Sequence, residues 1–125
     1  MNIKALTEKY KKHFHEYYSL LDGNTDGRQP PARPDFLQEV ILPILDRLPE
    51  ALPGYGFKPP EKGYAMYGEY YRIKCGITLL GGFSVNEKFE LFFTPLFRSR
   101  PCGKPVRVTD MEQLSTELLK QIRRK

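Results

Sequence analysis

The sequence predicts an α+β fold in which an antiparallel sheet of three or four strands packs against helices. Apolar residues recur at spacings of three and four near both ends of the 125-residue chain, and they alternate with polar residues through its middle. Gly, Asn and Pro separate these stretches. The expected order is α-α-β-β-β(-β)-α in a single domain, 1–125, with a helical half at 1–50, a β-rich part at 64–108 and a C-terminal helix at 110–124.

Two helices are expected in the first half. Residues 3–21 carry one apolar stripe at helical spacing, formed by Leu6, Tyr10, Phe14, Tyr17 and Leu21. Residues 35–48 carry a wider stripe that is interrupted by Pro43. Because proline lacks the backbone N–H and its ring clashes with the preceding turn, Pro43 should kink this helix or split it in two. A connector rich in Pro and Gly follows at 49–60.

The strands are expected at 64–79, 89–97 and 104–108. Gly68 suggests a bulge or a tight turn that divides the first of them. Gly81-Gly82 is a turn dipeptide by composition, as is Asn86-Glu87. The last helix should begin with a capping box, Thr109-x-x-Glu112.

Charge is distributed unevenly along the chain. The net charge is +5, yet residues 1–63 contain nine Lys or Arg and nine Asp or Glu, so the excess lies entirely in residues 64–125. From Leu91 to Thr109 the chain has no acidic residue. Such asymmetry indicates an acidic partner for the C-terminal half, because clustered cations attract and steer oppositely charged surfaces. A solvated surface that serves only solubility is the competing interpretation.

The residues expected to contact an acidic macromolecule are the cations Arg72, Lys74, Arg98, Arg100, Lys104 and Arg107, together with the aromatic residues Tyr64, Tyr67 and Tyr70. Exposed rings beside Arg and Lys are typical of single-stranded nucleic-acid platforms, where rings stack on bases and cations meet phosphates. Protein interfaces are enriched in the same residue types. We therefore expect a non-catalytic binding domain with nucleic acid as its first partner, or else a protein-interaction module such as an inhibitor, immunity-type partner or assembly adaptor. A sheet covered by helices on both faces would expose no such platform.

Tyr70-Tyr71-Arg72-Ile73-Lys74 resembles a strand of the RelE/HigB-like ribonuclease toxins, and Arg98 to Arg100 stands where a basic strand end would be. The resemblance covers about thirty residues, and the chain lacks the N-terminal strand common in that family. It implies a small basic α+β protein that cleaves RNA without a metal. The acid, base and phosphate-stabilising roles would then fall to Tyr71, Arg72, Lys74, Arg98 and Arg100.

Other chemistry is not indicated. The sequence has no phosphate loop, nucleophile elbow or paired Cys-x-x-Cys, so no catalytic residue, cofactor or metal site is predicted. Cys75 and Cys102 are expected to be reduced thiols. Met1 to Tyr18 lacks the apolar segment of an export signal, and no apolar run is long enough to cross a bilayer. We expect a cytoplasmic protein that does not enter membranes.

Overall fold

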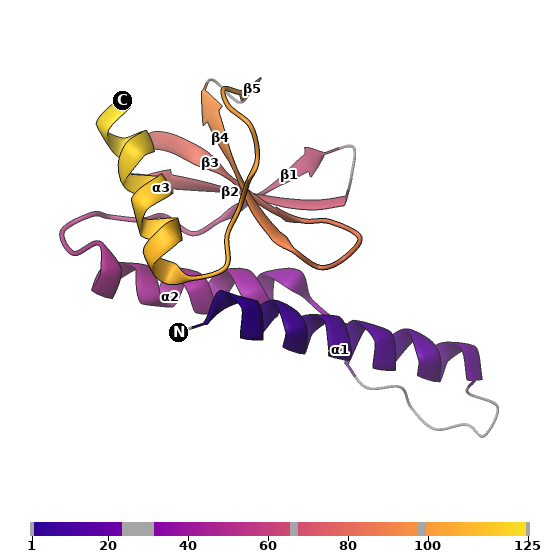
Figure 1. The fold of residues 1–125 in the computed structure, drawn as a ribbon. Coiled ribbons are helices and arrows are strands. Elements are labelled where there is room, and N and C mark those ends of the chain that lie inside the picture. Colours follow the sequence, from indigo (N-terminus) through magenta and orange to yellow (C-terminus); the bar gives the residue numbers. More distant parts are fainter. Residues whose placement is uncertain (1, 24–31, 66–67, 98–99, 125) are drawn as a thin grey trace.

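The computed structural model describes residues 2–23, 32–65, 68–97 and 100–124. Within these residues three α-helices and an antiparallel sheet follow one another in the expected order, which confirms the α+β fold (Figure 1). The helical elements are α1 (Ile3–Gly23), the π-helical turn η1 (Leu37–Ile41), α2 (Leu42–Ala51) and α3 (Met111–Arg124). The strands are β1 (Glu61–Ala65), β2 (Gly68–Cys75), β3 (Thr78–Val85), β4 (Leu91–Phe97), β5 (Arg100–Pro101) and β6 (Val106–Arg107).

The second helix changes its hydrogen bonding just before Pro43 but is not split, because Ile41 and Leu42 at the join both keep right-handed helical backbone angles. The chain first forms η1, where the N–H of Leu42 donates to the carbonyl of Leu37, and α2 then begins with Pro43 in its first turn. A proline is tolerated there because its fixed backbone angle suits the start of a helix. The helix also continues beyond its expected end, through Pro49 to Ala51.

His13 connects α1 to the chain that precedes η1. Its Nδ1 lies 2.7 Å from Oε1 of Glu39, and its Nε2 lies 2.7 Å from the carbonyl oxygen of Ala32. Both neighbours are acceptors, so both ring nitrogens donate only when the imidazole is protonated. The hydrogen bond to Glu39 accordingly raises the pKa of His13, while desolvation opposes the shift. The other oxygen of Glu39 accepts the N–H of Asp35 at 2.8 Å.

The strands form one antiparallel sheet in the order β1-β2-β3-β4-β5, and β6 also pairs with β4. The Gly81-Gly82 dipeptide lies inside β3, so the expectation of a turn there is wrong. The physical reason is that neighbouring rings fill the places of the missing side chains: a Cβ on Gly81 would overlap Phe93, and one on Gly82 would overlap Tyr70. The β2–β3 turn lies earlier, at Gly76, where φ is 61°.

A β-bulge in β3 sends one additional side chain into the core. Ile73 pairs with Gly81, whereas the next residue, Lys74, pairs with Leu79, so Leu80 has no partner of its own. Leu80 is fully buried in the hydrophobic core.

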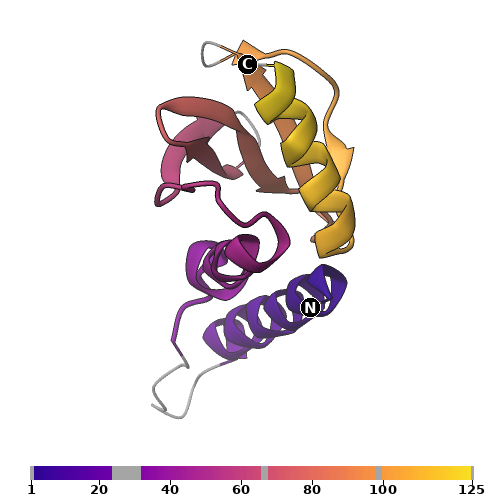
Figure 2. The ribbon, with the colours of Figure 1, turned by 90° about the vertical axis from the view of Figure 1, so that its left-hand side faces the viewer.

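The hydrophobic core lies on one face of the sheet and is shared by all three helices. Figures 1 and 2 show α3 across this face, with α2 and then α1 at its lower end. Among the described residues, no helix packs on the opposite face, so the sheet is not enclosed on both sides. The buried core includes Ile3 and Tyr10 of α1, Ile44 and Leu48 of α2, Leu114 and Leu118 of α3, and Tyr71, Ile73, Phe83, Leu91 and Phe93 of the sheet.

The cap of α3 is shifted by one residue from the expected capping box. Oδ1 of Asp110 accepts the N–H of Gln113 at 2.7 Å, and Oε1 of Gln113 accepts the N–H of Thr109 at 3.1 Å. Asp110 therefore serves as the N-cap in place of Thr109, and Gln113 accepts from the N–H of the residue before that cap, not from the N-cap residue as in a capping box.

Candidate nucleic-acid interface

The face of the sheet without helices, here called the open face, is built from two rows of residues that pair across the strands. Paired residues of an antiparallel sheet point to the same side, so the register identifies the members of each row. The first row runs from β1 to β6 through Gly63, Tyr70, Ser84, Phe92 and Arg107. The second row runs from β1 to β4 through Glu61, Arg72, Gly82 and Thr94.

Tyr70 lies near the centre of the open face with its ring resting on glycines. A Cβ on Gly63 would come within 2.5 Å of the ring, and a Cβ on Gly82 would overlap it. The two glycines thus leave room for the ring to lie low over the strands. Burial raises the pKa of the Tyr70 phenol, against the opposing charge of Arg72, so the ring stays neutral at physiological pH.

Phe92 provides a second ring in the same row. It is half-buried, pairs with Ser84 and Arg107, and stands apart from the described core, whereas its neighbours Leu91 and Phe93 are fully buried within it. The sequence did not single out Phe92, because Leu91, Phe92 and Phe93 are all apolar and the alternation that would assign a face is missing.

Arg72 and Lys74 share one carboxylate on the open face. Nη2 of Arg72 lies 3.8 Å from Oε2 of Glu61, and Nζ of Lys74 lies 3.3 Å from Oε1 of the same residue. The Nε of Arg72 is buried and has no hydrogen-bond partner. Two cations facing one carboxylate leave an excess positive charge on this side of the open face.

Arg107 forms the edge of the open face together with Glu90, which lies 2.9 Å from its Nη1. A hydrogen bond from Asn86 lowers the pKa of Glu90, and the charges of Arg107 and Lys88 lower it further, while desolvation acts in the opposite direction. Glu90 is therefore ionised at neutral pH and holds the guanidinium against the strand.

The remaining sites expected from the sequence lie elsewhere or outside the described residues. Arg100, opposite Phe97 at the far end of β4, and Lys104, in the connection to β6, are exposed and form no ion pair with any described residue. Arg98, Tyr67 and the side chain of Tyr64 lie outside the described part of the structure. The structure thus brings together Tyr70, Arg72, Lys74 and Arg107 but not the whole basic set.

Among the residues implied by the ribonuclease resemblance, the described ones are not gathered at one site. Tyr71 is 6% exposed in the core, with its ring 5.9 Å from that of Phe36. Arg72 and Lys74 point to the opposite side of the same strand. Cys75 and Cys102 are both free thiols.

No known protein family, curated protein or solved structure matches this chain. Among the described helices, none combines the length and apolar character that crossing a membrane requires. The functional argument therefore rests on the geometry of the open face.

Proposed function

We propose that the protein binds single-stranded nucleic acid on the open face. The observation that carries the proposal is the cross-strand row in which Tyr70, Ser84, Phe92 and Arg107 are paired side by side on a face without a helix. Rings on an open antiparallel sheet offer stacking surfaces to unpaired bases, and flanking guanidinium groups offer bidentate contacts to phosphates.

Each residue has a distinct role in this proposal. Phe92 stacks on one base, and the low-lying ring of Tyr70 supports a neighbouring base. Arg72 and Arg107 bind phosphates with the guanidinium N–H groups that their carboxylate partners leave free. Their side chains are 32% and 51% exposed, so a ligand can reach both of them.

The test is fluorescence anisotropy of labelled oligo-U and oligo-dT of about 12 nucleotides, a length in the range of known single-strand sites. Phe92→Ala is expected to weaken binding about 5- to 150-fold, since stacking on one ring is worth about 1 to 3 kcal/mol. Phe97→Ala is the matched control, because Phe97 is 54% exposed at the far end of β4. Equal binding by the two variants would overturn the proposed role of Phe92.

Salt provides the second measurement. Each phosphate contact to a single strand contributes about −0.7 to the slope of log affinity against log salt. Arg107→Gln should make the slope of log affinity against log salt less steep by about 0.7. Arg47→Gln, which alters another exposed arginine paired with a glutamate, should leave it unchanged. Binding that does not change between about 50 and 200 mM salt would contradict phosphate recognition.

A protein-interaction module is the second candidate, favoured by exposed apolar side chains away from the open face. Tyr18, Leu20 and Leu21, which are neighbours near the end of α1, are 39%, 49% and 44% exposed. Large exposed apolar side chains are typical of protein-binding surfaces when they are grouped. A protein that passes a heparin column at low salt and binds neither oligonucleotide would favour this candidate.

A further inference from the structure

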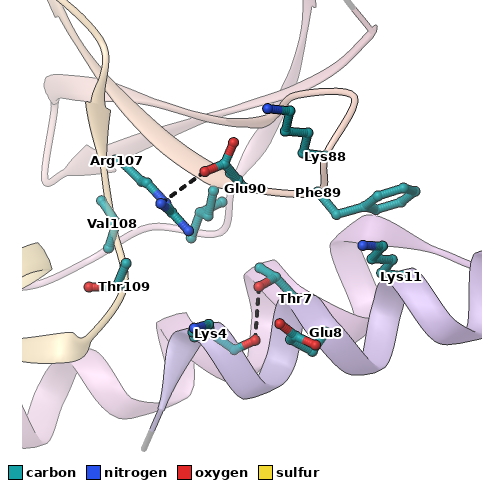
Figure 3. Close-up of a pocket in the computed structure, with 11 residues that line it drawn as sticks. Lys4, Thr7, Glu8, Lys11, Lys88, Phe89, Glu90, Arg107, Val108 and Thr109 are labelled. Atoms are coloured by element: carbon teal, nitrogen blue, oxygen red, sulfur yellow. Dashed lines mark hydrogen bonds and ion pairs between the residues drawn. The ribbon is translucent and has the colours of Figure 1, made fainter.

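A small cavity lies beyond the Arg107 end of the open face, at the junction of three segments that are distant in the sequence (Figure 3). Its walls come from the first half of α1, from the β3–β4 turn with the start of β4, and from the connection between β6 and α3. Its volume is about 50 Å³. Because one water needs about 10 to 15 Å³ on this measure, the cavity has room for a few small groups and is closer in size to a phosphate than to a base.

The lining of the cavity is rich in cations. Figure 3 shows lysines from α1 and from the turn on opposite sides of the cavity, with Glu90 directed toward Arg107. The charged residues in its walls are four cations and two carboxylates: Lys4, Lys11, Lys88, Arg107, Glu8 and Glu90.

The two carboxylates do not balance this charge. Glu90 is already held by Arg107 at 2.9 Å and accepts a hydrogen bond from Nδ2 of Asn86, also at 2.9 Å. Glu8 is then the only other carboxylate in the lining, and its single negative charge stands against the three positive charges of the lysines. Lys4, Lys11 and Lys88 are all exposed, and none forms an ion pair with a described residue. An anion in the cavity would supply the missing negative charge.

Backbone hydrogen bonds join the walls to one another, so the segments that carry the cations are held in fixed relative positions. The N–H of Lys4 donates to the carbonyl of Thr109 at 3.3 Å, which joins α1 to the segment before α3. The N–H of Val108 donates to the carbonyl of Leu91 at 2.9 Å, which joins that segment to β4. A preformed frame of this kind lowers the conformational cost of binding.

We propose that this cavity is a phosphate-binding subsite, which receives a phosphodiester group of the strand as it leaves the open face past Phe92 and Arg107. The proposal rests on the proposed function, because Arg107 belongs both to the row that carries the rings and to the wall of the cavity. Lysines suit this task as compact charges that can approach a phosphate from several directions. Free inorganic phosphate has the same chemistry and is the other possible source of the ligand.

The first experiment titrates the protein with inorganic phosphate and follows the backbone amides of Leu91 and Thr109 by NMR, with sodium chloride at equal ionic strength as the reference. Saturable shifts are expected with phosphate and absent with chloride. Lys11→Gln and Lys88→Gln should each weaken phosphate binding at least about threefold, since each removes one charge-assisted contact. Lys9→Gln, which removes an exposed lysine of α1 outside the cavity, should have no effect. Identical shifts with phosphate and chloride would overturn the proposal.

The second experiment repeats the oligonucleotide titrations with Lys88→Gln. The slope of log affinity against log salt should become less steep by about 0.7. The loss of affinity caused by Phe92→Ala should be the same with and without Lys88→Gln. Oligonucleotide binding that needs Phe92 but is indifferent to Lys88 would leave the proposed function standing and refute the subsite as part of it. Phosphate binding without any oligonucleotide binding would refute the proposed function and identify free phosphate as the ligand.

Discussion

The ring of Tyr70 on β2 occupies the space above Gly82 on the neighbouring strand β3, where a side chain would otherwise stand. A glycine inside a strand normally weakens the strand, because it adds conformational entropy to the unfolded chain and offers nothing to pack. Here the ring supplies the missing packing. The relationship explains why Gly82 lies inside a strand, and it fixes the height of Tyr70 on the open face.

The first prediction concerns Gly82→Ala. The added methyl group would overlap the ring, so the variant should lose about 1 to 3 kcal/mol of unfolding free energy, the usual cost of overpacking. Urea denaturation measures this loss. Gly56→Ala is the matched control, because a Cβ there meets nothing within 4 Å, and it should change stability by less than about 0.5 kcal/mol. Equal stability of the two variants would show that the ring moves aside freely.

The second prediction concerns Phe89, which has φ of 61° in the β3–β4 turn while its ring contacts Tyr10, Phe14 and His15 of α1. Phe89→Gly and Phe89→Ala both lose these contacts, but only alanine keeps the left-handed strain. The glycine variant should therefore be more stable than the alanine variant by about 1 kcal/mol in urea denaturation.

The same pair of substitutions at Lys88 is the control for this comparison. Among the described non-glycine residues, Phe89 alone has a positive φ, so Lys88 carries no such strain. Lys88→Ala should then be at least as stable as Lys88→Gly, the reverse of the order at Phe89. The same order at both positions would contradict the strain argument.

The third prediction is a pH dependence of stability that arises from His13. Its pKa is raised in the folded state, so its contribution is fully present below the unfolded pKa of about 6.5 and is lost as pH rises through the folded pKa. Unfolding free energies measured from pH 6 upward should fall in the wild-type protein, and the fall should be smaller in His13→Gln. His15→Gln, which removes the other histidine, should retain the wild-type fall. An identical pH profile for His13→Gln would exclude this contribution.

The fourth prediction separates the two faces of β4. Phe93 is completely buried in the core, so Phe93→Ala should lose about 3 to 5 kcal/mol of unfolding free energy. Phe92 lies on the open face and is half-buried, so Phe92→Ala should lose distinctly less and give a folded protein for binding measurements. Chemical denaturation of both variants tests this, and a greater loss in Phe92→Ala would mean that the faces are assigned the wrong way round.

The chain by itself predicted the three helices and the α+β order of the protein, but it missed β3, which contains the dipeptide Gly81-Gly82 that was expected to form a turn. Helical spacing of apolar residues predicted the helices, and alternation in β2 correctly placed Tyr71 and Ile73 on one side of the strand and Arg72 and Lys74 on the other. Pro43 predicted an irregularity in the second helix, which takes the form of the π-helical turn before it. These features depend on local stereochemistry and on periodicity, which can be read over a few residues.

Tertiary structure decided the rest, because the remaining features depend on neighbours that are distant in the sequence. Gly82 lies in a strand because a ring from β2 covers it, and Phe92 faces away from the core because all three helices pack on the other side. Glu61 meets Arg72 and Lys74 only through the pairing of β1 with β2. The cavity beside Arg107 is lined by three separate segments, so no local pattern of residues could predict it.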